Sequence, residues 1–167
     1  MREMLYEAAY WRPNTERPEL EDGLRRPDLQ KLLAGWGREG DTAVIAESAD
    51  GSRVGAAWYR FWTSEDHSYG FVDNKTPELG IAVHPAHRRH GIGRELLRSL
   101  LPEAKTRGVK QISLSVEADN PARQLYLSLG FRKLHRVGGA WTMVIDLDRL
   151  PDPSSASRTE GQSLGAQ

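Results

Sequence analysis

Two stretches near the start of the chain place their apolar residues at helical spacing. The first predicted helix runs from about Arg2 to Trp11, and the second begins at Asp28 and ends at Gly35 and Gly37. Their buried stripes are Met4, Leu5, Ala8 and Ala9 in the first helix and Leu29, Leu32 and Leu33 in the second. The connection, residues 14–26, is polar and contains proline, so we expect a surface loop, either ordinary or placed over the substrate.

Alternating apolar and polar positions predict strands in the next part of the chain. Residues 42–47 and 53–62 read as an antiparallel hairpin, because the turn 48–52 joins two alternating runs. Residues 69–73 are predicted to form a short strand. The run 78–83, in which larger apolar residues alternate with smaller ones, is then expected to be the fourth strand.

A long helix and a parallel strand are predicted to follow this fourth strand. Pro85 ends the extended run, and leucines then recur at helical spacing from position 96 to 101. Residues 111–116 alternate again. Strand, helix and strand therefore form one crossover unit whose two strands lie parallel.

The last predicted elements are a short helix and a hairpin. Asn120 with Pro121 suits a helix start, and Gly130 suits its end. Residues 132–137 and 140–147 form a closing hairpin through two glycines. This order predicts a mixed α/β fold with a largely antiparallel sheet and one parallel pair.

Composition narrows the classes of function. The length of 167 residues predicts one domain over residues 1–150, followed by a polar, flexible tail at 151–167. The 23 basic and 23 acidic residues balance, which does not favour nucleic acid or membrane partners. Cysteine is absent, so disulfides and Cys-ligated zinc are excluded. No apolar run suits a membrane span or secretory signal, and we expect a cytoplasmic protein.

The start of the long helix combines glycines with basic residues. Gly91 and Gly93 allow backbone N–H groups to approach a ligand, and the helix dipole adds positive charge there. The loop therefore predicts a pyrophosphate site, although a tight turn is the alternative. The residues expected to bind are Arg88, Arg89, His90, Gly91, Ile92, Gly93 and Arg94, the last of which could instead be solvated. The histidines at 84, 87 and 90 lack acidic or Cys partners nearby, so no metal is expected.

These residues resemble a known family. Val83-His-Pro, then Arg88-x-x-Gly91-x-Gly93, then Glu95-Leu-Leu resembles the acetyl-CoA-binding motif of the GNAT superfamily of N-acetyltransferases. The run from Asn120 through Tyr126 to Gly130-Phe131 is similar to its second element. The resemblance covers about residues 5–147 and implies a GNAT fold with acetyl-CoA as co-substrate. Family members usually have a strand before the first helix; here either that edge strand is lacking or the chosen start codon lies downstream of the natural one.

The resemblance also implies a chemistry. Acetyl would pass directly to a primary amine in a ternary complex, with Glu78 as the base and Tyr126 as the acid that protonates the leaving thiolate. The N–H of Val83 is expected to bond the acetyl or pantetheine oxygen, and Asn120 to contact the pantetheine arm. Structural alternatives stay open: a core aromatic for Tyr126, a solvated strand end for Glu78 and a helix cap for Asn120. Other possible bases are Asp73, Glu117 and His84.

The acceptor is a small-molecule or peptide amine that the residues do not identify. Asp73 or Glu65 could attract a cationic amine. Aromatic residues that could line the acceptor site, or simply belong to the core, are Trp58, Tyr59, Trp62, Phe71 and Trp141.

One rival function is a non-catalytic acyl-CoA sensor or interaction module of the same fold. A nucleotide-binding protein is disfavoured because neither a P-loop nor a dinucleotide glycine motif is present. A homodimer, through sheet edges or the closing hairpin, is also expected.

Overall fold

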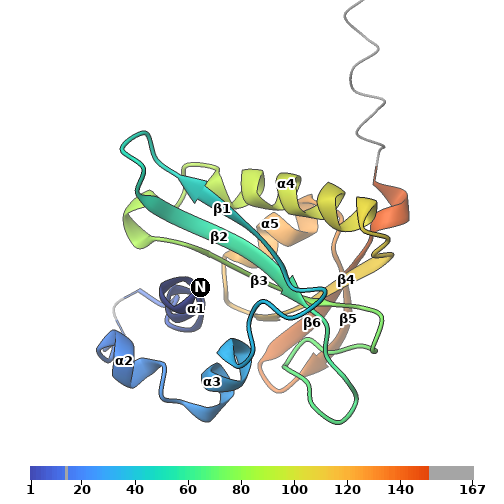
Figure 1. Ribbon diagram of the computed structural model, residues 1–167, viewed down its shortest axis with the longest axis horizontal. Coiled ribbons are helices and arrows are strands. Elements are labelled where there is room, and N and C mark those ends of the chain that lie inside the picture. The colour runs from blue at the N-terminus through green and yellow to red at the C-terminus, as the bar shows by residue number, and fades with distance from the viewer. Residues whose placement is uncertain (14, 151–167) are drawn as a thin grey trace, which may run out of the picture.

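A six-stranded mixed sheet forms the centre of the computed structural model, which describes residues 1–13 and 15–150 (Figure 1). The order across the sheet is β1-β2-β3-β4-β6-β5, and every neighbouring pair is antiparallel except β3 and β4. The strands are β1 (Thr42–Glu47), β2 (Arg53–Arg60), β3 (Glu78–Val83), β4 (Gln111–Glu117), β5 (Arg132–Val137) and β6 (Ala140–Asp146). The predicted fold class is confirmed.

Helices cover both faces of this sheet (Figure 1). On one face lie α4 (Ile92–Thr106) and α5 (Ala122–Ser128); on the other lie α1 (Arg2–Ala9), α2 (Leu20–Gly23) and α3 (Pro27–Leu33). Short 3-10 helices occur at Pro85–His87 and Leu147–Arg149. Because neighbouring strand residues point to opposite faces, Tyr59 packs under α4 while Trp58 packs with α1 and α3.

Burial of the leucine stripe explains why α4 lies along the sheet. Leu97 and Leu100 are completely buried in a core that includes Ile112 and Leu114 of β4. A buried leucine side chain contributes about 1.5–3 kcal/mol relative to an exposed one. Both β3 and β4 therefore pack against α4, although the two strands pair with each other over only a short length.

The predicted short strand at residues 69–73 is wrong. The structure has a turn at Tyr69 and Gly70 followed by irregular backbone, so the strand beginning at Glu78 is the third strand rather than the fourth. The physical reason is the contact that Gly70 makes: its N–H donates to the Glu78 carboxylate at 2.9 Å instead of joining a strand ladder. Periodicity does not report such a contact between a loop and a side chain.

The N-terminal connection also differs from the expected loop, because it contains α2. Its residue Gly23 lies under the first helix, where an added Cβ would stand 2.8 Å from the Tyr6 ring and 3.1 Å from the Tyr10 ring. The Tyr10 hydroxyl donates to the Gly23 carbonyl at 3.3 Å. Tertiary packing on α1 therefore supports a four-residue helix that the local pattern does not predict.

The two predicted hairpins, the crossover and the short helix are confirmed, with β2 ending two residues earlier than expected. The predicted tail at 151–167 lies outside the described residues. Across the described ranges, no helix is long and apolar enough to cross a membrane.

A buried ion pair joins β2 to the segment after α3. The side chains of Arg60 and Asp41 are 3% and 2% exposed, and the guanidinium donates to both carboxylate oxygens, at 2.9 and 2.6 Å. Arg60 also donates to the carbonyls of Leu32 and Ala34. Burial acts to raise the pKa of Asp41, but the bonds and charge of Arg60 together with the Gly37 N–H outweigh it, and the pKa is lowered.

We expect Asp41→Ala to lower the free energy of unfolding by about 3–5 kcal/mol, because it leaves the buried Arg60 charge without its partner. Urea denaturation would measure the change. Glu95→Ala is the matched control: its ion pair with Arg98 is exposed, and its removal should cost less than about 1 kcal/mol. Equal small losses in both variants would contradict a stabilising role for the buried pair.

Candidate active site

The parallel strands β3 and β4 separate soon after they begin. Within the described residues their register contains one pair, Glu78 with Ser113. At the other end of β3, the His84 N–H donates to Val54 of β2 at 2.8 Å. Strand alternation therefore turns the N–H groups of Ile81 and Val83 away from β2, towards the gap. A ligand placed in the gap can use these unpaired backbone groups.

The loop before α4 presents free backbone N–H groups. Arg89 and Gly91 both have positive φ, of 67° and 84°, which turns successive amides outward. Within the described chain, the N–H groups of residues 89–93 have no hydrogen-bond partner; the Arg94 and Glu95 N–H groups bond to the Gly91 carbonyl. Such a row of amides at a helix start is an arrangement that binds anions in proteins, phosphate groups among them.

The side chain of Arg88 has partners other than those the sequence suggested. Its Nε donates to the Val83 carbonyl at 2.9 Å, and its Nη2 pairs with Glu7 Oε2 at 3.0 Å. Nη1 donates to the Trp11 carbonyl at 3.2 Å. Arg88 therefore ties the end of β3 to the end of α1. Positive charge beside the free amides comes instead from the exposed side chain of Arg89.

Helix α5 packs against the first turn of α4. The guanidinium of Arg94 donates to Ser128 Oγ at 3.0 Å, and a Cβ added to Gly93 would lie 3.3 Å from Leu125. Tyr126, on the same helix, is buried with its ring 5.7 Å from that of Phe131. Burial raises the pKa of Tyr126 above its usual value, so its hydroxyl stays protonated at neutral pH.

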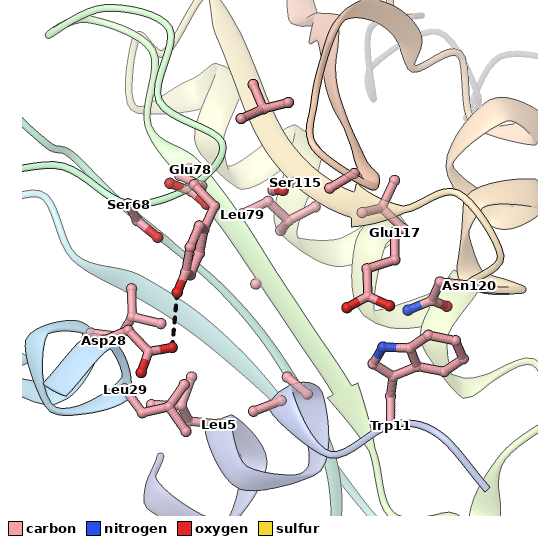
Figure 2. Close-up of a pocket in the computed structure, with 18 of the residues that line it drawn as sticks. Leu5, Trp11, Asp28, Leu29, Ser68, Glu78, Leu79, Ser115, Glu117 and Asn120 are labelled. Atoms are coloured by element: carbon pink, nitrogen blue, oxygen red, sulfur yellow. Dashed lines mark hydrogen bonds between the residues drawn. The ribbon is translucent and has the colours of Figure 1, made fainter. Parts of the chain in front are cut away.

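A cavity of about 830 Å³ lies between the sheet and the helices α1 and α3 and reaches the gap between β3 and β4. Figure 2 shows Glu78 and Ser68 on one side and Trp11, Glu117 and Asn120 on the other. Of the predicted site residues, Glu78 and Asn120 line this cavity. Tyr126 and the loop 88–94 lie outside its lining.

Glu78 has one bonded and one free carboxylate oxygen. Its Oε1 accepts the Gly70 N–H at 2.9 Å, whereas Oε2 is buried without a hydrogen-bond partner among the described residues. Burial raises the pKa of Glu78 to about 7, against the opposing effects of Gly70, Ser68, His67 and Lys31. A carboxylate with this pKa is about half ionised at neutral pH and can accept a proton.

At the other side of the cavity, Asn120 and Glu117 differ in how far their side chains are engaged. Asn120 Oδ1 caps α5 by accepting the Ala122 N–H at 2.9 Å, while its Nδ2 has no partner in the described chain and can still donate. Glu117, considered as an alternative base, is paired with Arg12, which also bonds Asp119 at 2.5 Å. The segment Trp11–Arg12 thus connects the end of α1 to the end of β4.

The chain matches the model of the Acetyltransferase (GNAT) family over residues 4–131. It belongs to the GNAT family. The family match and the open β3–β4 gap agree with the predicted GNAT fold, and the protein is an acetyl-CoA-dependent N-acetyltransferase.

Two curated GNAT relatives cover 91% of this chain and 87% of their own length. They are the L-amino acid N-acyltransferase MnaT of Escherichia coli K12, at 30% identity, and the L-methionine sulfoximine/L-methionine sulfone acetyltransferase of Salmonella typhimurium LT2, at 32%. A similar solved structure is that of yncA, a putative acetyltransferase from Salmonella typhimurium with its cofactor acetyl-CoA. It has 28% identity and a TM-score of 0.59, over 91% of this chain and 89% of that one.

Two of the other residues named from the sequence line the cavity, and the rest lie outside its lining. Asp73 accepts the Lys75 and Thr76 N–H groups in a turn, Glu65 bonds its neighbour Ser64, and His84 is exposed outside the cavity. Trp58 and Trp62 line the cavity, whereas Tyr59 is in the core, Phe71 stacks on His67 and Trp141 lies beneath Lys133. In the ranges that the structure describes, no group of three His, Cys, Asp or Glu could hold a metal.

Several cavity residues were missed by reasoning from the sequence. Ser68 and Tyr69 come from the β2–β3 loop, and the Tyr69 hydroxyl donates to Asp28 at 2.8 Å, the dashed line in Figure 2. Trp11 and Arg12 come from the end of α1. None of these positions stands in a motif, and their place depends on how distant segments pack.

We expect Gly91→Val to abolish the thermal stabilisation that acetyl-CoA gives, because a β-branched residue is strained at φ 84° and displaces the free amides. Gly108→Val is the matched control. Gly108 has φ 83° and open space around it, so the backbone strain is the same but the site lies at the far end of α4. Thermal shift with millimolar acetyl-CoA checks both variants; an unchanged shift in Gly91→Val would exclude the loop as the cofactor site.

Proposed function

We propose that this N-acetyltransferase moves acetyl from acetyl-CoA directly to the primary amine of a small molecule, with Glu78 as the general base. The observation that carries the proposal is the Glu78 Oε2 atom, which is buried at the cavity, beside the start of the β3–β4 gap, with no hydrogen-bond partner in the described ranges. An amine attacks a thioester only after losing a proton. Glu78 is placed to take that proton, directly or through a water molecule.

The acyl donor would occupy the gap and the loop. The free N–H groups of residues 89–93 bind the pyrophosphate, and the Val83 N–H and Asn120 Nδ2 bond the pantetheine arm or the acetyl oxygen. These assignments are supported by donors without a hydrogen-bond partner in the described chain, namely the N–H groups of residues 89–93 and Asn120 Nδ2. The Val83 N–H faces away from β2, although the amides of His84, His87 and Arg88, between it and the loop, are already bonded.

The amine nitrogen then forms a bond to the acetyl carbon, and the carbonyl oxygen gains negative charge. As the carbonyl re-forms, the C–S bond breaks and the nitrogen releases its second proton. Tyr126 gives its hydroxyl proton to the departing thiolate and is restored by the proton that the nitrogen releases; burial raises the pKa of Tyr126, so the hydroxyl starts out protonated at neutral pH. Support for this role comes from α5, which carries Tyr126 and packs on the first turn of α4.

For the acceptor, we propose a small amine of the L-amino acid class. The two relatives that match almost the whole chain are named for L-amino acids and for methionine sulfoximine and sulfone. A ribosomal protein bS18-alanine N-acetyltransferase of Salmonella typhimurium is 50% identical, but over 33% of this chain. A panel of amino acids, their decarboxylated amines and N-terminal peptides would test the class.

A homodimer stays a prediction.

We expect Glu78→Gln to lower kcat/KM by roughly 10²–10⁴-fold, because the amide cannot accept a proton. In the unaltered enzyme the rate should rise with pH through about 7 as Glu78 ionises, and this acid limb should vanish in the variant. The variant should be at least as stable above pH 7, because a carboxyl whose pKa is raised by folding costs the protein stability progressively between its unfolded-state pKa of about 4.3 and its folded-state pKa of about 7. Full activity with the same acid limb would place the base elsewhere.

We expect Tyr126→Phe to lower kcat at least about tenfold while the affinity for acetyl-CoA changes little, because the hydroxyl acts on the leaving group. Steady-state kinetics and acetyl-CoA titration separate the two effects. Tyr59→Phe is the control: it removes another buried hydroxyl, from the core under α4, and should leave kcat unchanged. Equal rates in the two variants would make Tyr126 a packing residue.

A further inference from the structure

The loop between β2 and β3, residues 61–77, comes unusually close to the start of the β3–β4 gap. A Cβ added to Gly70 would lie 2.7 Å from the Leu114 carbonyl carbon, 2.8 Å from the Ser115 nitrogen and 2.9 Å from Glu78 Oε1. Two of these three atoms belong to the backbone of β4, which cannot rotate away as a side chain does. A side chain at position 70 therefore requires the loop or the strand to move.

Space, rather than backbone conformation, is what requires glycine here. Gly70 is not among the glycines with positive φ, so another residue could adopt its backbone angles. The crowding arises because the Gly70 backbone fits between the Glu78 carboxylate and β4. This position lies beside Glu78 and Ser113, the one β3–β4 pair in the register of the described strands.

Contacts with α3 hold the loop on the N-terminal side of Gly70. The Tyr69 hydroxyl donates to Asp28 at 2.8 Å, and Lys31 Nζ reaches the His67 carbonyl at 2.6 Å and Asp66 Oδ1 at 2.7 Å. On the other side of Gly70, the Phe71 ring stacks on His67 at 4.6 Å. The Gly70 N–H is therefore held in a defined place when it donates to Glu78 Oε1 at 2.9 Å.

We propose that Gly70 is a positioning residue for acetyl transfer: its N–H holds one oxygen of Glu78 and so leaves the other free to take the acceptor's proton. The proposal rests on Glu78 being the base. The bond acts on the ionised carboxylate and opposes the effect of burial. The other groups that act on Glu78 in the same direction are Ser68 and His67 on the loop and Lys31 on α3.

The first test is the pH dependence of kcat/KM in Gly70→Ala. The added Cβ forces the loop or β4 to move, which takes the backbone N–H of residue 70 away from Glu78. Loss of this hydrogen bond destabilises the ionised carboxylate, so the acid limb should move to higher pH by roughly one unit, with acetyl-CoA affinity retained. Gly55→Ala is the matched control for crowding. A Cβ there would meet the Ala82 carbonyl at 3.0 Å, away from Glu78, so stability can fall but the acid limb should stay.

A second measurement uses the unaltered protein and does not depend on whether Gly70→Ala folds. The NMR shift of the Gly70 amide should titrate with the same apparent pKa as the acid limb, and the titration should disappear in Glu78→Gln. A Gly70 amide that does not follow pH, or a folded Gly70→Ala enzyme with an unmoved acid limb, would overturn the positioning role.

These outcomes separate the two proposals. If Glu78→Gln is inactive while the Gly70 amide does not titrate, the base assignment stands and the positioning role fails. If Glu78→Gln keeps its activity and its acid limb, the base assignment fails, and the role of Gly70 fails with it.

Discussion

The separation of β3 from β4 is the constraint on which the rest of the site depends. Parallel strands normally satisfy each other's backbone groups, and unpaired groups are costly when they are buried. Here the register contains one pair, Glu78 with Ser113, and α4 supports both strands through its leucine stripe. The sheet can therefore keep the gap between β3 and β4 open without losing its core. The open edge of β3 leaves backbone groups that an extended polar ligand can bond.

Among the described residues, most charged side chains around this gap are paired, and Glu78 is not. Arg60 pairs with Asp41, Arg88 with Glu7, and Arg12 with Glu117 and Asp119. Glu78 instead keeps a buried oxygen without a partner in the described chain. A lone buried carboxylate lowers stability, which is why its pKa rises and why such a group suggests a function rather than a role in folding. The paired arginines meanwhile fasten α1 and α3 to the strands that border the cavity.

Sequence patterns were sufficient where structure is local. Period-3.6 spacing predicted α1, α3 and α4, alternation predicted the two hairpins, and Gly91 and Gly93 located the loop whose amides are free. Patterns failed where a segment takes its structure from distant neighbours. Residues 69–73 alternate like a strand, yet Gly70 bonds a side chain on β3 and lies against the backbone of β4. Arg88 stands in a phosphate-binding motif, yet its side chain bonds Glu7, 81 positions earlier.

By itself, the sequence determined the family, the order of most elements and the position of the loop whose backbone amides are free, because these depend on periodicity and on residue types at short spacing. The tertiary structure decided which groups meet at the cavity. It placed Trp11 and Arg12 at the end of β4, paired Glu117 with Arg12, and brought Gly70 against Glu78. The physical reason is that burial and hydrogen bonding set the state of a carboxylate, and both are supplied by segments far apart in the chain.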